Sequence, residues 1–213
     1  WSWNMLEFWN YFVDLLARYK QGYQREGRFT LLFMAFARMF LLRPEGGESY
    51  SVSVNIKDVI VHGVPDIRFP VRNVIKGEAE QKLFIVTEVK NYNAFIGEFS
   101  SETFCSENIS KNVLGQHGIE LVMERSASFF YPGIVGIICI GTKVIFTYLE
   151  ITNTHFDQIN QGTVDKTQKA VVNYTRPFDY MNVNDRNTLM EVLFWLGYVQ
   201  TDGYNILGKG LSG

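Results

Sequence analysis

The sequence predicts a single α/β domain, in which a mixed β-sheet is flanked by helices and further helices lie at both ends of the chain. Three observations indicate this fold class. Apolar residues recur at helical spacing near both termini, the apolar period changes to two in the middle, and one uninterrupted apolar run is typical of a strand buried on both faces. No internal repeat or linker between two cores is found. We therefore expect one domain over 1–213, with a core over 28–151 and helical extensions over 1–27 and 152–213.

The N-terminal part of the chain is expected to form two helices. The first, over 5–19, is predicted by apolar residues at helical spacing and by a capping box of Asn4 and Glu7. The second, over 29–42, is apolar on nearly every side, which is typical of a central helix. Three aromatic side chains fall on one face of the second helix and are assigned to packing: Phe33, Phe36 and Phe40.

Strands are predicted where the apolar period becomes two. The first covers 52–56, and a second β stretch runs over 59–69. This stretch contains Pro65, which cannot donate to a ladder and is expected at an edge, a bulge or a bend. A polar turn over 72–81 leads to a strand over 83–90 that ends in charged residues.

The rest of the chain continues the alternation of helix and strand. Residues 91–107 are expected to be irregular, and 108–125 to be helical. The continuous apolar run over 134–140 predicts a buried strand, which a two-residue Gly–Thr hairpin loop joins to a partner strand over 144–151.

Residues 152–175 are polar and show no clear pattern. A last helix is predicted over 185–196, and the glycine-rich tail from Gly203 onward is expected to be mobile.

Composition and charge exclude several classes of protein. With 46% hydrophobic and 20% charged residues, the chain is neither disordered nor of low complexity. A net charge of −2 argues against a globally basic nucleic-acid binder, although it leaves room for a local basic channel. Cys105 and Cys139 fit neither a metal-ligand spacing nor a disulfide framework, which favours a reducing compartment.

Neither a membrane span nor a signal peptide is recognised. The longest apolar run, 29–42, is shorter than the roughly 20 residues that a spanning helix needs. We therefore expect an intracellular protein, cytoplasmic or nuclear, without a membrane partner. The chain begins with Trp1 rather than Met and is expected to be an excised domain or a processed product.

One constellation of charged residues is able to carry chemistry. Asp66 follows Pro65 in one β stretch, and the next strand ends in Glu88, Val89 and Lys90. Because side chains alternate along a strand, Glu88 and Lys90 share a face, and Asp66 lies beside Glu88 if the two strands are hairpin neighbours. Two carboxylates are the ligands that Mg²⁺ or Mn²⁺ prefers. Such a metal acidifies a bound water and screens a phosphate, while the ammonium group orients the water or stabilises the developing charge.

Pro65-Asp66 followed by Glu88-Val89-Lys90 on consecutive strands resembles the motif of the PD-(D/E)XK nuclease superfamily. The resemblance covers about 29–151, where the expected element order matches the restriction-endonuclease-like αβββαβ core. It implies a metal-dependent phosphodiesterase that acts on nucleic acid, DNA or RNA. It also implies that Asp66 and Glu88 bind the metal together with the Val89 carbonyl, and that Lys90 assists the attack of water.

Many members of the superfamily carry a glutamine on the helix that follows the motif strand. Gln116 occupies such a helix here, between Gly115 and Gly118, and shares a face with Glu120. The resemblance implies that Gln116 orients the substrate or the water. The glutamine helix, apolar strand and aromatic hairpin strand are also similar to nuclease domains of Crinkler-type effectors.

The sequence departs from the family at the first core helix, where many members place an acid. The predicted helix over 29–42 contains none, because Glu26 precedes it and Glu45 follows it. Either the site manages with fewer ligands, or Glu26 reaches in, or activity is lost, and neither Glu26 nor Glu45 is assigned to the site. The last alternative is a nuclease-like domain that has lost catalysis and serves as a binding or interaction module.

Two further alternatives remain open. A Glu-x-Lys triplet also occurs at Glu80, so the pair formed by Glu88 and Lys90 is also compatible with an ordinary surface ion pair. The chain is equally compatible with an effector or scaffold domain whose partner surface is the aromatic-rich first helix, with Trp1, Trp3 and Trp9 as exposed anchors. Terminal helices of this kind also make a homodimer possible.

Overall fold

The structure of the chain is a computed structural model that describes residues 2–19, 25–47, 51–57, 59–72, 81–97, 103–165 and 167–207. Its α-helices are α1 (Ser2–Tyr19), α2 (Glu26–Arg38), α3 (Lys111–Glu124), α4 (Asn153–Gln161) and α5 (Val183–Leu207). The strands are β1 (Glu45–Gly46), β2 (Val52–Ile56), β3 (Val59–Gly63), β4 (Ile67–Arg72), β5 (Gln81–Lys90), β6 (Ile134–Ile140), β7 (Lys143–Glu150), β8 (Val171–Tyr174) and β9 (Phe178–Asp179). Short 3₁₀ helices lie at Tyr92–Ala94, Ser106–Asn108 and Arg125–Ala127.

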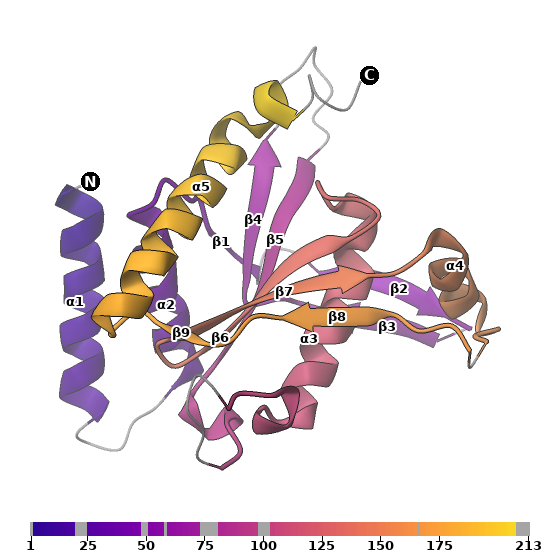
Figure 1. Cartoon of the computed structure of the whole chain (residues 1–213), viewed down its shortest axis with the longest axis horizontal. Coiled ribbons are helices and arrows are strands. Elements are labelled where there is room, and N and C mark those ends of the chain that lie inside the picture. The colour runs from indigo at the N-terminus through magenta and orange to yellow at the C-terminus, as the bar shows by residue number, and fades with distance from the viewer. Residues whose placement is uncertain are drawn as a thin grey trace.

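A mixed sheet flanked by helices forms the centre of the molecule, so the predicted α/β class is confirmed at this level (Figure 1). The strand order is β1-β4-β5-β6-β7-β8, and β9 also pairs with β7. Strands β5 and β6 are parallel, whereas the other pairs are antiparallel. The tight hairpin between β6 and β7 is confirmed, with Ile140 opposite Lys143.

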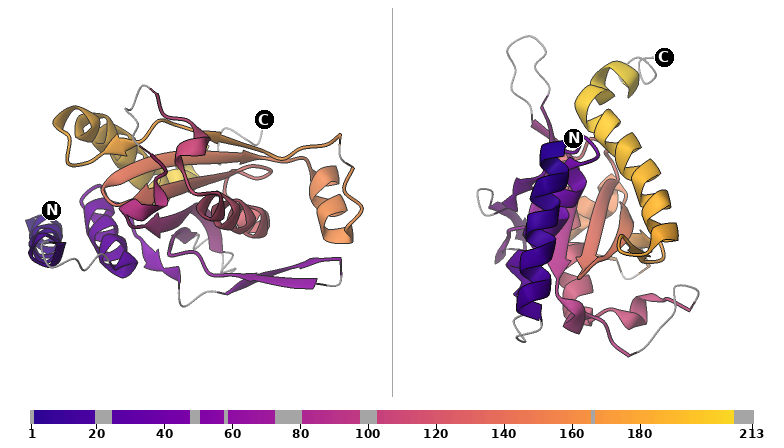
Figure 2. Two further views of the ribbon diagram at one scale, coloured as in Figure 1. Left: turned by 90° about the horizontal axis from the view of Figure 1, so that it is seen from below. Right: turned by 90° about the vertical axis from the view of Figure 1, so that its left-hand side faces the viewer.

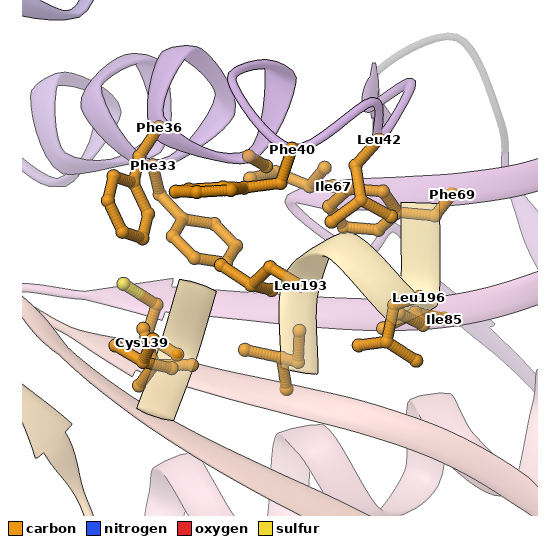
Figure 3. Packing of buried hydrophobic residues seen from close by; sticks show 14 of the residues in the cluster. Phe33, Phe36, Phe40, Leu42, Ile67, Phe69, Ile85, Cys139, Leu193 and Leu196 are labelled. Carbon is orange, nitrogen blue, oxygen red and sulfur yellow. The ribbon is translucent and has the colours of Figure 1, made fainter. Parts of the chain in front are cut away.

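Helices cover both faces of this sheet (Figure 2). On one face, α2 and α5 pack on β4, β5 and β6 and form the largest hydrophobic cluster. The three phenylalanines assigned to packing are buried in it, as Figure 3 shows, and this prediction is confirmed: Phe33, Phe36 and Phe40. On the other face, α3 supplies Leu121 and Val113 to two smaller clusters. The strand face beneath α3 is the one that carries the charged motif.

The β stretch expected over 59–69 is divided, and its first part leaves the central sheet. Strand β3 ends at Gly63 and β4 begins at Ile67, with Pro65 in the bend between them. Strands β2 and β3 form a separate two-stranded sheet that contacts α3 and α4. The expectation of three consecutive strands in one sheet is therefore wrong, because the proline interrupts the ladder and the hairpin packs on helices instead.

Several element boundaries also differ from the prediction. Helix α2 begins at Glu26 and ends at Arg38, since Leu41 adopts a positive φ of 67° that no helix accommodates. The polar stretch over 152–175 contains both α4 and β8, and α5 continues to Leu207. Of the polar turn expected over 72–81, Arg72 ends β4 and Gln81 begins β5. Residues 73–80 and the tail beyond 207 lie outside the described residues.

Helix α5 packs unusually close to the chain that follows α2. A Cβ atom added at Gly197 would lie 1.9 Å from the carbonyl oxygen of Phe40. We expect Gly197→Ala to destabilise the protein by about 3 kcal/mol, because this backbone atom cannot move without shifting the core. Urea unfolding followed by circular dichroism measures the change. Gly118→Ala is the matched control: nothing lies within 4 Å of that position, so alanine should be neutral or stabilising by up to about 1 kcal/mol. Equal effects of the two variants would contradict the packing argument.

Candidate functional site

Strands β4 and β5 bring Asp66 and Glu88 to the same end of the sheet. The strands are antiparallel neighbours, as expected, and Ile67 pairs with Thr87. Asp66, one residue before Ile67, therefore lies opposite Glu88. One Asp66 carboxylate oxygen accepts a hydrogen bond of 2.7 Å from the backbone N–H of Val89, which holds the carboxylate against the end of β5.

Glu88 is fully buried, with an exposed fraction of 0%. Its carboxylate forms an ion pair with the ammonium of Lys90, two residues further along the same face of β5. Its other polar neighbours are the carboxyl groups of Asp66 and Glu120. A buried carboxylate placed among other acids is costly, because its lost hydration is not replaced by donors. An arrangement of this kind is more typical of a functional site than of a surface ion pair.

Lys90 connects this carboxylate to a further acid. Its ammonium nitrogen lies 3.5 Å from a carboxylate oxygen of Glu26, in the first turn of α2. Glu26 is not among the predicted site residues, and the predicted start of the helix at 29 is wrong by one turn, since α2 begins at Glu26. The prediction followed the apolar run alone, whereas the polar residues before it complete the helix. The helix dipole favours an acidic residue in the first turn of a helix, and this preference could have indicated that the helix begins at Glu26.

Helix α3 adds a buried acid that the sequence analysis did not assign to the site. Glu120 is 2% exposed and lies next to Glu88. One of its oxygens accepts a 3.2 Å hydrogen bond from the amide nitrogen of Gln116, and the other oxygen has no partner in the described part of the chain. Gln116 itself is exposed and reaches the site through Glu120. Gln116 and Glu120 are one helical turn apart, so their spacing in the sequence could have indicated that Glu120 also faces the site.

The pKa values of the cluster follow from burial and charge. Burial and the carboxylates of Glu120 and Asp66 raise the pKa of Glu88 to about 8. Burial also raises the pKa of Glu120, to about 7, and that of Asp66. Burial alone would lower the pKa of Lys90, but its hydrogen bond to Glu88 and the surrounding negative charge raise it instead. Four carboxyl groups, including that of Glu26, thus lie around the single ammonium group of Lys90, and the raised pKa values favour the protonated form of the buried ones.

His117 on α3 is buried. One ring nitrogen lies 2.8 Å from the hydroxyl oxygen of Thr147 on β7. Burial lowers the pKa of His117 to about 3, so the imidazole is neutral at physiological pH. Strand β7 covers this face of α3, which a helical spacing alone does not reveal.

The donor set suits a hard divalent cation in its chemistry. The carboxyl groups of Glu88 and Glu120 lie buried next to each other, and Mg²⁺ typically takes one or two carboxylates and completes its shell with water. In the described ranges, no three His, Cys, Asp or Glu side chains are already arranged to hold a metal ion. Val89, predicted as a carbonyl ligand, lies between Glu88 and Lys90 on β5, and its backbone N–H donates to Asp66.

The site opens into a groove of about 670 Å³. Glu26 and Asp66 line it together with residues of α2 and of the bend before β4, among them Gly27, Leu31 and Pro65. A ligand in this groove would reach Glu26 and Asp66, whereas Glu88 and Glu120 are buried.

Comparisons of the chain with protein-family models, with curated proteins and with solved structures found no match. The class of this site therefore rests on its residues and geometry. None of the described helices is long and apolar enough to cross a membrane.

Proposed function

We propose that this chain is a metal-dependent phosphodiesterase of the PD-(D/E)XK type that cleaves nucleic acid. The observation that carries the proposal is the fully buried carboxyl group of Glu88, which lies beside the carboxyl groups of Asp66 and Glu120 and is ion-paired with Lys90. A bound cation would stabilise the ionised forms of these carboxyl groups. The succession of α2, the motif strands, α3 and the β6–β7 hairpin supports a restriction-endonuclease-like core, from which the separate β2–β3 hairpin departs.

Each residue has a role in this proposal. Asp66 and Glu88 would hold Mg²⁺ or Mn²⁺, with the Val89 carbonyl and Glu120 as further oxygen donors. The bound metal would acidify a water molecule and screen the phosphate. Lys90, held between Glu88 and Glu26, positions its ammonium to orient the attacking water and to stabilise charge developing on the phosphate oxygens. Gln116 keeps Glu120 turned into the site through its amide hydrogen bond.

The first test is cleavage of labelled single- and double-stranded DNA and RNA oligonucleotides with Mg²⁺, with Mn²⁺ and with EDTA. We expect cleavage only with divalent metal, and a loss of at least about 100-fold in Lys90→Ala, the usual effect of removing one group that stabilises the transition state. Lys169→Ala removes an exposed ammonium from a loop and should change the rate less than twofold. Oligonucleotide binding without cleavage under any of these conditions would overturn the proposal in favour of an inactive binding module.

A further inference from the structure

Helix α1 is apolar on both of its sides, although only one side is covered. Its inner side packs against α2, where the ring centroids of Phe8 and Phe36 lie 5.7 Å apart. Its outer side carries six exposed apolar residues: Trp3, Met5, Leu6, Trp9, Val13 and Leu16. Trp3 is 80% and Trp9 57% exposed. The helix lies at the outside of the molecule, beside α2 (Figures 1 and 2). A helix that carries apolar residues on two sides normally lies between two layers, so a second layer is expected here.

The spacing of these residues places them in one stripe along the helix. Leu6, Trp9, Val13 and Leu16 follow one another at intervals of three, four and three residues. Such a stripe can mesh with the corresponding stripe of another helix.

The charged residues of α1 are all used within the chain. Glu7 pairs with Arg38 at 2.8 Å, and Asp14 pairs with Arg18 at 2.8 Å and also with Arg28. Among the described residues, no acid or base of α1 is left to select a partner of opposite charge. Two copies of this face would not repel each other, which favours a self-complementary contact.

The exposed area agrees with a dimer of ordinary size. Since a buried aromatic side chain removes about 150–250 Å² from water, the six side chains present roughly 600 Å² together. Polar residues on the borders of the same face bring this close to the about 800 Å² that each partner contributes to a standard interface. The bulky tryptophans lie in the first half of α1 and the smaller Val13, Leu16 and Ala17 in the second, so an antiparallel pairing places large side chains against small ones.

We propose that α1 is the dimer interface of this protein and that its outer face docks, antiparallel, against α1 of a second copy. Trp9 and Asn10 then lie near the twofold axis. The proposal is independent of the phosphodiesterase assignment, since it rests only on the outer face of α1.

The test is light scattering on the full 213-residue chain across a dilution series. We expect twice the chain mass of 24.6 kDa for the wild type, and a single chain mass for Trp9→Glu, which places two like charges at the axis. Trp195→Glu changes a tryptophan of similar exposure on α5 and should leave the dimer intact. Circular dichroism confirms that each variant is folded. A wild type that stays monomeric at about 100 µM, or a dimer unaffected by Trp9→Glu, would overturn the proposal.

The antiparallel arrangement has its own readout that does not depend on a disruptive variant. In a Cys105→Ser background, which removes the exposed native thiol, Asn10→Cys should form a disulfide-linked dimer under mild oxidation, because residues at the axis approach their own copies. Ala17→Cys, distant from the axis, should cross-link at least tenfold less. The reverse ranking would show that the helices do not pair in this way.

Discussion

Replacing Glu88 with glutamine is expected to reduce metal-dependent hydrolysis by about 1000-fold and, without metal, to stabilise the protein at pH 8. The loss of activity follows from removing an anionic metal ligand and the partner of Lys90. The gain in stability follows from the raised pKa of Glu88, about 8 against 4.5 for an unperturbed glutamate. Between these values the folded state binds a proton that the unfolded state has lost, so this group's contribution to stability falls as the pH rises from 4.5 to 8.

Glutamine has the same shape and does not ionise, so the variant escapes this loss. Allowing for the ion pair with Lys90 that is given up, we expect a gain of about 2 kcal/mol at pH 8.5 and little difference at pH 5. Urea unfolding in EDTA at both pH values measures it. Glu107→Gln, an exposed acid near α3, should show neither effect. Destabilisation by Glu88→Gln at pH 8.5 would mean that the carboxylate is structurally paired and would count against the metal site.

Divalent metal should reverse the order of stability. Ligand that binds only the folded state stabilises it according to its concentration relative to the dissociation constant. The wild type should therefore gain thermal stability with Mn²⁺, whereas the glutamine variant should lose most of that gain.

Replacing Arg125 with alanine is expected to destabilise the protein by about 3–4 kcal/mol, although the residue lies outside the candidate site. Arg125 is 2% exposed and follows the end of α3. Its guanidinium donates to the carbonyl oxygen of Pro132 at 2.8 Å, to that of Ile151 at 3.4 Å and to the side-chain oxygen of Asn153. It also lies over the rings of Tyr131 and Phe156, 4.8 and 4.7 Å from their centroids.

This one side chain thus joins the end of α3 to the start of β6, the end of β7 and α4. Alanine would leave buried carbonyl groups without donors and create a cavity, and both effects destabilise. Lysine should recover only part of the stability, because a single ammonium cannot reach three acceptors and two rings at once. Chemical denaturation of the wild type and of Arg125→Ala measures the change in the free energy of unfolding. Arg43→Ala, which removes an exposed arginine side chain, is the control. A change below about 1 kcal/mol in Arg125→Ala would contradict this account.

The sequence by itself determined the elements whose signals are local. The apolar run of β6, the Gly–Thr loop before β7 and the phenylalanine face of α2 each report on a few consecutive residues, and each was found where expected. The motif residues Asp66 and Glu88 also meet as their strand positions indicate, because alternation and an antiparallel register leave little freedom once the two strands are neighbours.

Only the tertiary structure decided what surrounds those residues. Glu26 approaches Lys90, and Glu120 is buried against Glu88, because α2 and α3 lie on opposite faces of the sheet and both reach the end of β5. The departure of β2 and β3 from the central sheet and the burial of His117 depend in the same way on segments distant in the chain. A local pattern states which side of an element is apolar. The loss of water around a side chain, which sets its pKa and its need for a partner, depends on which other element covers it.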